Sequence, residues 1–193
     1  VSLLFELIDD VGFPPGVVQL VYGPGDPVGS CLAASPLVDK IAFTGGGVTG
    51  RKIQIAAASN FKKISLELGG KSPNIIFADA DPDVALEYAL FGIFAGQGEV
   101  CSAGSRLLLD RRLGGDFLHR LVSACEKIVV GSGLDEATEM GPLISRAHQK
   151  KVLDYIQAGC CEGGEIICGG WTYNDKRSAG NFVQPTIFSN TKP

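Results

Sequence analysis

The sequence predicts an α/β fold built on parallel strands. Short apolar runs alternate along the chain with segments of helical periodicity, and glycine-rich turns separate them. This alternation is typical of strand-helix-strand units, in which helices cover both faces of a parallel sheet. With 45% hydrophobic and only 20% charged residues in a chain of 193, there is enough apolar surface for a packed core.

The first unit, residues 1–62, is expected to be part of a nucleotide-binding type of sheet. Aliphatic residues at helical spacing predict a helix over 3–11, which a Gly-Phe-Pro-Pro-Gly turn ends. Glycine-rich turns precede each of the next two predicted helices. The remaining predicted elements are strands at 17–21 and 40–43 and helices at 27–35 and from the Thr44–Gly50 turn to about residue 59.

The second unit, residues 63–193, is expected to alternate strands and helices again. The boundary rests on the placement of motifs, since no low-complexity linker marks it. Asp81 followed by Pro82, and Ser145 before an amphipathic stretch, are typical helix starts. The predicted elements are strands at 64–68, 74–77, 106–109, 165–168 and 182–188 and helices at 82–94, 117–128 and 146–158.

Composition and charge exclude several classes of protein. A net charge of −4 with scattered lysines provides no basic field for nucleic acid. No apolar run approaches the roughly 20 residues of a membrane-spanning helix, and the N-terminal residues show no basic start followed by an apolar core and a cleavage site, so we expect neither a membrane location nor secretion. The six cysteines show neither disulfide-framework nor metal-site spacing, so we expect reduced thiols, no metal and a cytoplasmic location. The chain opens at Val1 inside a predicted helix, so we expect it to be a fragment of a longer protein.

Cys101 lies in a loop of small residues between an apolar helix and a strand. The loop reads Phe-Ala-Gly-Gln-Gly-Glu-Val-Cys-Ser-Ala-Gly-Ser-Arg over 94–106, and such a loop allows a substrate to approach closely. A thiol reacts as the thiolate, which backbone amides, a helix end or a cation can stabilise. A small buried hydrophobe is the alternative for any lone cysteine, and we accept it for the other five.

Glu67 lies near the end of a predicted strand, between Leu66 and Leu68. Glycines at 69 and 70 follow, and these allow the backbone to lie close to a ligand. A carboxylate flanked by apolar side chains is suited to act as a general base. The alternative is a surface glutamate on an alternating strand.

Together these segments resemble the aldehyde dehydrogenase superfamily. The run 67–73 matches the glutamate signature of the family and 94–105 matches its cysteine signature, with a glutamate variant at Glu99. Segments at 43–45, 141–143 and 184–188 resemble further landmarks, so the resemblance spans the chain. The residues of the signature segments are most similar to those of betaine-aldehyde and aminoaldehyde members.

The resemblance implies a Rossmann-like cofactor-binding sheet followed by the α/β catalytic domain. It implies NAD as cofactor, with NADP possible, and glycine-rich contacts to it. Exposed amides where a helix begins after Gly45 favour a pyrophosphate. Family members commonly have serine where Gly46 stands, and Gly25 would lie near the adenosine end. The implied cofactor-binding residues are Thr44, Gly45, Gly46, Leu68, Gly69 and Gly25.

The resemblance also implies a mechanism. Cys101 attacks an aldehyde and forms a thioester, which water activated by Glu67 hydrolyses to a carboxylic acid. Glu99 would relay protons or have a structural role in the loop. The alternatives are a CoA-acylating semialdehyde dehydrogenase and a non-catalytic relative or fragment. We expect the isolated chain to be inactive and the full-length protein to be a homodimer or homotetramer.

Overall fold

The computed structural model describes residues 1–191 and confirms an α/β fold. The chain divides into two compact units, unit 1 (Val1–Gly69) and unit 2 (Gly70–Pro193). The structural boundary therefore lies later than the boundary that we placed between residues 62 and 63. The difference arises because strand β2 (Lys63–Leu68) pairs with β1 (Lys40–Gly45), so the strand expected to open the second unit belongs to the first.

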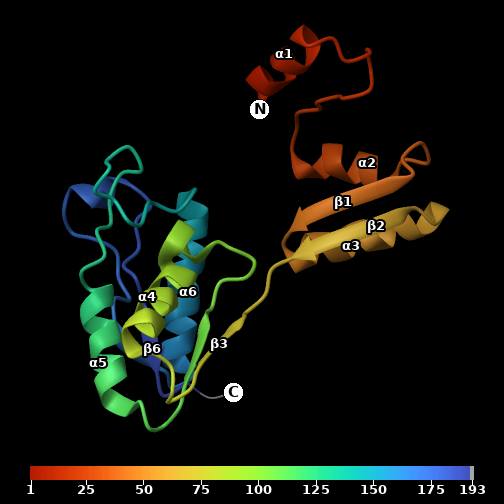
Figure 1. Cartoon of the computed structure of the whole chain (residues 1–193). Coiled ribbons are helices and arrows are strands. Elements are labelled where there is room, and N and C mark those ends of the chain that lie inside the picture. The colour runs from red at the N-terminus through yellow and green to blue at the C-terminus, as the bar shows by residue number, and fades with distance from the viewer. Residues whose placement is uncertain (192–193) are drawn as a thin grey trace. The chain divides into compact units, whose positions relative to one another are not determined.

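Unit 1 is built around the parallel pair β1 and β2, which helix α3 (Gly47–Ala57) connects (Figure 1). A short turn of helix, η2 (Ala58–Asn60), follows α3. Gly50 of α3 is buried, and a Cβ there would lie 2.8 Å from Leu68 Cδ2. Glycine at this position therefore allows α3 to pack closely on β2.

The expected cover of helices on both faces is not found within unit 1. Residues of β1 alternate between exposed and half-buried, as they do on a strand with one packed face. Helix α2 (Ser30–Ala34) contacts α3, so the two helices lie together. Lys62 is buried beside them and donates from Nζ to the Ser35 carbonyl at 2.6 Å, which gives one donor of its ammonium group a partner.

The N-terminal part of unit 1 contains one confirmed helix and one wrong strand. Helix α1 (Ser2–Asp10) forms where the spacing predicts it. Residues 17–21, predicted as a buried strand, pair with no strand of the described chain, and Val17 is 65% exposed. An apolar run becomes a strand only where a neighbour supplies the hydrogen-bond ladder. The chain then passes through a helical turn, η1 (Gly25–Gly29), into α2.

Unit 2 begins with a second parallel pair, β3 (Pro73–Ile76) and β4 (Arg106–Leu109), connected through helix α4 (Pro82–Phe94). The predicted start of α4 is confirmed. Asp81 Oδ1 accepts from the Asp83 and Val84 amides at 2.9 and 3.2 Å, and Pro82 occupies the first turn. Such a cap satisfies amides that the helix itself leaves unpaired.

The core of unit 2 lies between α4, β3 and helix α5 (Gly114–Cys125). Ile76, Ala89, Phe117 and Leu121 form its buried cluster. Phe117 and Leu121 stand on one face of α5, as the sequence predicts, and they are 2% and 5% exposed. Burying a large apolar side chain contributes about 1.5–3 kcal/mol, so Ile76, Phe117 and Leu121 each stabilise the unit by roughly that amount.

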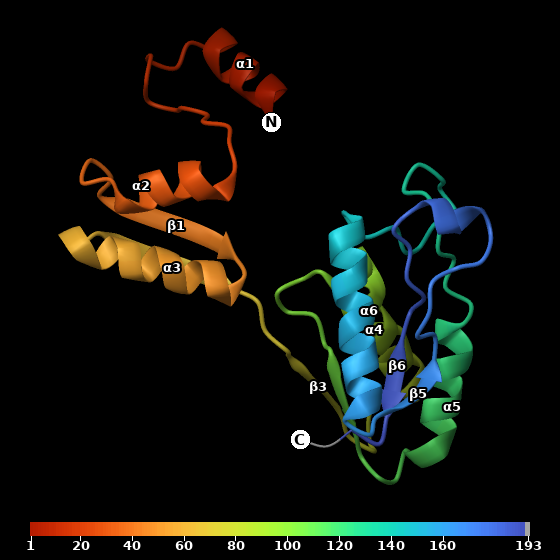
Figure 2. The same ribbon diagram turned by 180° about the vertical axis from the view of Figure 1, so that it is seen from behind.

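Helix α6 (Arg146–Cys161) begins at its predicted cap, where Ser145 Oγ accepts from the His148 amide at 3.2 Å. Strand β5 (Glu165–Cys168) contacts both α6 and α5 and pairs antiparallel with β6 (Ile187–Ser189) (Figure 2). The last strand is shorter than the predicted 182–188. Gln184 donates its amide to the Trp171 carbonyl instead, so the ladder begins only at Ile187.

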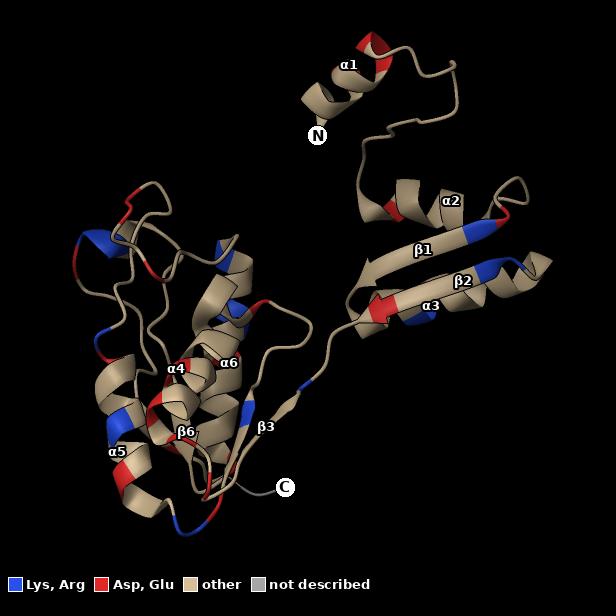
Figure 3. Ribbon diagram, viewed as in Figure 1, with Lys and Arg blue, Asp and Glu red and all other residues tan. Residues whose placement is uncertain are grey.

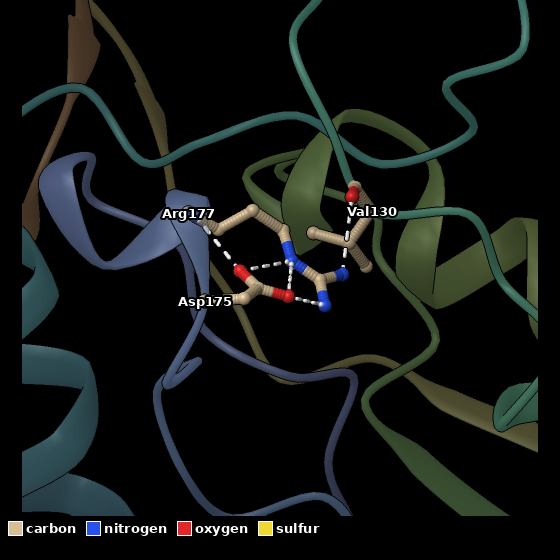
Figure 4. Close-up of polar contacts among 3 residues, drawn as sticks. All are labelled: Val130, Asp175 and Arg177. Carbon is tan, nitrogen blue, oxygen red and sulfur yellow. Dashed lines mark hydrogen bonds and ion pairs between the residues drawn. The ribbon is translucent and has the colours of Figure 1, made fainter.

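A short helix, η4 (Lys176–Ala179), is fastened to the loop after α5 by Arg177 (Figure 4). The guanidinium pairs with Asp175, donates to the Val130 carbonyl at 3.3 Å and lies 3.5 Å from the centroid of the Tyr173 ring. The same guanidinium lowers the pKa of the Asp175 carboxyl to about 2. This contact connects two loops that are distant in the sequence.

Candidate active site

Unit 1 brings five of the predicted site residues together at the ends of its two strands. In the register of the parallel pair, Thr44 lies beside Glu67 and Gly45 lies beside Leu68. Gly46 follows as the residue that precedes helix α3. Ligands of open α/β sheets bind beyond the carboxyl ends of the strands, and these residues occupy that edge.

The start of α3 leaves backbone amides available. Gly46 has an extended conformation, and no side chain caps the first turn of the helix. A Cβ at Gly46 or Gly47 would meet nothing within 4 Å, so the space in front of the helix is open. Unpaired amides at the start of a helix favour an anion, and the arrangement fits a pyrophosphate.

Gly69 and Gly25 lie at different places relative to the predicted site residues at the ends of β1 and β2. Gly69 follows β2 directly and is exposed, so it extends the same edge. Gly25 begins η1, whose main neighbour is α2, and the side of Gly25 where a Cβ would stand is open. Gly25 thus lies on a different element from the strand ends, and the role that the resemblance implies for it stays a prediction.

Glu67 is the single acidic residue of β2 and lies near the end of the strand (red at the tip of the β2 arrow in Figure 3). Its side chain is exposed, although Leu66 and Leu68 flank it. Neighbouring β2 residues alternate, with Leu66 half-buried on the packed face. A carboxylate on the open face of a strand can accept a proton from water or from a bound ligand.

Cys101 belongs to unit 2 and lies in the loop between α4 and β4. A distorted helical turn, η3 (Ala95–Gly98), precedes it. Gly96, Gln97 and Gly98 all have positive φ, between 58° and 72°. These conformations turn the chain sharply, and the Cys101 side chain that follows is exposed.

Backbone hydrogen bonds fix the part of the loop that follows Cys101. Ala103 is buried, and the Gly104 amide donates to the Gly92 carbonyl of α4 at 3.0 Å. A Cβ at Gly104 would lie 3.2 Å from Asn74 Cβ, so a larger residue would press on β3. This side of the loop is thus held against both neighbouring elements.

The end of the glutamate signature lies against the same loop. Arg106 donates from Nε to the Lys71 carbonyl at 2.9 Å and from its amide to the Ser72 carbonyl at 3.2 Å. A Cβ at Gly70 would lie 3.8 Å from the Cys101 carbonyl oxygen. Residues 70–72 and the cysteine loop are therefore neighbours within unit 2.

Two contacts of the loop involve residues to which the sequence assigned no role. His148 Nε2 lies 3.0 Å from Glu99 Oε1. The Gln97 amide, oriented to satisfy its hydrogen bonds, donates to the Gly96 carbonyl at 2.8 Å and accepts from the Gly141 amide at 2.9 Å. The family landmark at 141–143 is the only sequence signal that could have pointed to this segment.

The other five cysteines, all within the described chain, are free thiols like Cys101. Cys125 and Cys168 are buried and close enough to hydrogen-bond to one another, and burial raises the pKa of both thiols. Cys31 and Cys161 are exposed, and Cys160 is half-buried on α6. Of the exposed cysteines, only Cys101 lies in a loop with left-handed turns.

Within residues 1–191, no group of three His, Cys, Asp or Glu residues is arranged to bind a metal ion. No helix in the same residues combines the length and apolar character needed to cross a membrane.

Comparison with known proteins gives consistent matches along the chain. The profile of the "Aldehyde dehydrogenase family" matches residues 1–193. Betaine aldehyde dehydrogenase of Bacillus subtilis (strain 168) is 49% identical over 97% of this chain and 38% of its own length. Retinal dehydrogenase 2 of Homo sapiens is 47% identical over 95% of this chain and 35% of its own length.

Solved structures give the same result. Betaine aldehyde dehydrogenase from Staphylococcus aureus, in complex with NAD+, superposes with a TM-score of 0.96 at 42% identity. The alignment covers 98% of this chain and 38% of that one, so the chain spans well under half the length of these relatives. The profile match, the identities and the superposition agree, and the chain belongs to the aldehyde dehydrogenase family.

Proposed function

We propose that the protein containing this chain oxidises an aldehyde to a carboxylic acid with NAD(P), using Cys101 as nucleophile and Glu67 as general base. The observation on which this depends most is the exposed Cys101 thiol in a fixed loop of left-handed turns, in a chain of this family. Unit 1 would bind the cofactor, and unit 2 would provide the nucleophile.

Cys101 would act first, as a thiolate that adds to the carbonyl carbon of the aldehyde. The bond that forms is carbon–sulfur, and the carbonyl oxygen becomes an oxyanion. The Cys101 backbone amide, with an asparagine outside this chain, would stabilise this charge, because preorganised donors stabilise a developing oxyanion by several kcal/mol. Loss of hydride from the tetrahedral adduct leaves a thioester on Cys101.

The residues at the edge of unit 1 fit the cofactor. Thr44, Gly45 and Gly46 would contact its phosphates through the open start of α3, and Leu68 and Gly69 would lie along the adjacent strand end. When bound, NAD(P) supplies the hydride acceptor for the step at Cys101. We propose NAD as this cofactor because the Staphylococcus aureus neighbour binds it, and NADP as the alternative.

Glu67 would complete the reaction by taking a proton from water, which then attacks the thioester. The products are a carboxylic acid and the free Cys101 thiol. The exposed position of Glu67 on the open face of β2 supports this role, because the carboxylate is accessible to water. A CoA-acylating enzyme, which uses a thiol in place of water, would not need this base.

The substrate is proposed only as an aldehyde of the types that the relatives handle. A betaine aldehyde dehydrogenase and a retinal dehydrogenase match almost equally well, so overall identity does not select between their substrates. The resemblance of the signatures favours betaine aldehyde and aminoaldehydes.

The test is turnover by the full-length protein with betaine aldehyde, an aminoaldehyde and retinal. NADH absorbance is followed with NAD or NADP, and with or without CoA. NADH formation without CoA, with a free acid as product, supports the proposal. NADH formation only with CoA would establish the acylating alternative, and no NADH with any aldehyde would point to a non-catalytic relative.

A further inference from the structure

We infer that Gln97 and His148 are positioning residues for Cys101, because they fasten the part of the loop that precedes the nucleophile to the segment 141–148. The inference rests on the proposed function in assuming that Cys101 is the nucleophile. It adds two residues that do not touch the reacting atoms and act through the loop.

Gln97 shows that this part of the loop is held against an intrinsic preference. It is one of three non-glycine residues with positive φ among the described residues, at 59°. Such a conformation costs a residue with a side chain of order 1–3 kcal/mol and persists where the surroundings impose it. Here the side chain itself supplies the constraint, with bonds to the Gly96 carbonyl and the Gly141 amide.

Gly141 is matched to this contact. A Cβ at position 141 would lie 2.6 Å from the atom of the Gln97 side-chain amide that faces it, so a larger residue would push the amide away. The buried side chain of Met140 precedes it, and the Gly131 amide donates to the Met140 carbonyl at 3.1 Å. Gln97 therefore binds to a backbone amide that is itself fixed.

Glu99 makes the second attachment, two residues before Cys101. Its Oε1 lies 3.0 Å from His148 Nε2, and the two side chains are 41% and 35% exposed. A partly exposed pair of this kind contributes little to global stability, on the order of 0–1 kcal/mol. We therefore expect the Glu99–His148 pair to affect the geometry of the loop more than the stability of the fold.

His148 is presented by a fixed first turn of α6. Ser145 caps the turn, and Gln149 donates from Nε2 to the Phe182 carbonyl at 2.8 Å. Leu143 is buried, and it exchanges hydrogen bonds with Asn181 at 3.1 and 3.3 Å. The segment 141–148 is thus anchored on both sides of the two contact points.

The variants separate the contacts from general damage. Gln97→Gly removes the amide and keeps a residue that tolerates positive φ. His148→Ala removes the partner of Glu99, whereas His148→Gln keeps a donor of similar reach. His119→Ala is the matched control, because His119 is the other histidine and is exposed on α5.

The measurements are kcat and KM, the melting temperature and hydrogen exchange of the peptide that covers 95–104, all in the full-length protein. Misplacement of a reacting group by about 1 Å can cost 10²-fold, so we expect Gln97→Gly to lower kcat by about tenfold or more. His148→Ala should lower kcat by about threefold, in line with a partly exposed pair, and His148→Gln should restore it. Hydrogen exchange of the peptide 95–104 should accelerate in Gln97→Gly and His148→Ala, while their KM and melting temperature stay near the wild-type values. The control His119→Ala should match the wild type in every measurement.

Two results would overturn the inference: a wild-type kcat in Gln97→Gly, or a His148→Gln that is no better than His148→Ala. Failure of the proposed function has a different signature. A Cys101→Ser protein that still oxidised aldehydes, or a wild type that oxidised none, would reject the nucleophile. Loop exchange would then still decide whether Gln97 and His148 hold the loop, and unchanged exchange in both variants would reject that too.

Discussion

The loop around Cys101 and the region around Cys125 contain the same functional group in opposite settings. Cys101 is exposed in a glycine-rich loop, whereas Cys125 is 1% exposed at the end of α5 and lies beside the Cys168 thiol. Burial raises the pKa of the Cys125 thiol, and its contact with Cys168 raises it further. Only the thiolate is a nucleophile, so a cysteine of the second kind contributes to packing and one of the first kind can contribute to chemistry.

Cys101→Ser should give the largest effect, because it removes the nucleophile and changes little else. We expect turnover of the full-length protein to fall by at least about 10³-fold with an unchanged melting temperature. Steady-state NADH formation and thermal unfolding measure the two quantities. Comparable turnover in this variant would show that the two settings do not differ in function.

Phe117→Ala tests the opposite side of the comparison, since Phe117 is buried in the cluster on α5. Truncation of a buried phenylalanine leaves a cavity and typically costs about 3–5 kcal/mol of unfolding free energy. Denaturant unfolding should show this loss, while activity per folded molecule remains. An exposed residue of the same type, Phe61, is the control, and its truncation should cost almost nothing.

Cys125→Ser should also lower the free energy of unfolding, by less than Phe117→Ala does. A hydroxyl in this buried position is costly to desolvate, and we expect a loss of about 1–3 kcal/mol in unfolding free energy. Its kcat should equal that of the wild type. A fall in kcat without a loss of stability would mean that the buried thiols take part in the reaction.

Asp175→Asn should give the smallest effect, and a pH-dependent one. Arg177 lowers the pKa of Asp175 from 3.8 to about 2, so the charged carboxylate stabilises the fold above pH about 4. That contribution disappears as the pH falls through about 2. Unfolding curves of wild type and Asp175→Asn should therefore differ at neutral pH and converge in acid, and a gap that widened in acid would contradict the assignment.

The sequence was informative where local chemistry determines structure. The caps at Asp81 and Ser145 were predicted because their side chains bond to amides two or three residues away. The strand at 17–21 was wrong because a strand depends on a partner elsewhere, which periodicity does not reveal. The last strand was predicted too long for the same reason.

In the candidate site, too, local features were predicted from the sequence and contacts between distant segments were not. The Cys101 and Glu67 signatures are local and were identified from the sequence as predictions about chemistry. The contacts of Gln97 with Gly141 and of Glu99 with His148 join segments that are more than forty residues apart in the chain. Only the fold reveals such pairs, because nothing in either segment specifies the other.

The most direct test of the central claim is a single-turnover experiment with Glu67→Gln in the full-length protein. General-base assistance is typically worth about 10²–10⁴-fold, so steady turnover should slow by about that factor. Rapid mixing with aldehyde and excess NAD should still give a burst of about one equivalent of NADH per site, with an acyl adduct on the Cys101 peptide in mass spectra. No burst and no adduct on Cys101 would contradict the account and would place Glu67 before the first chemical step.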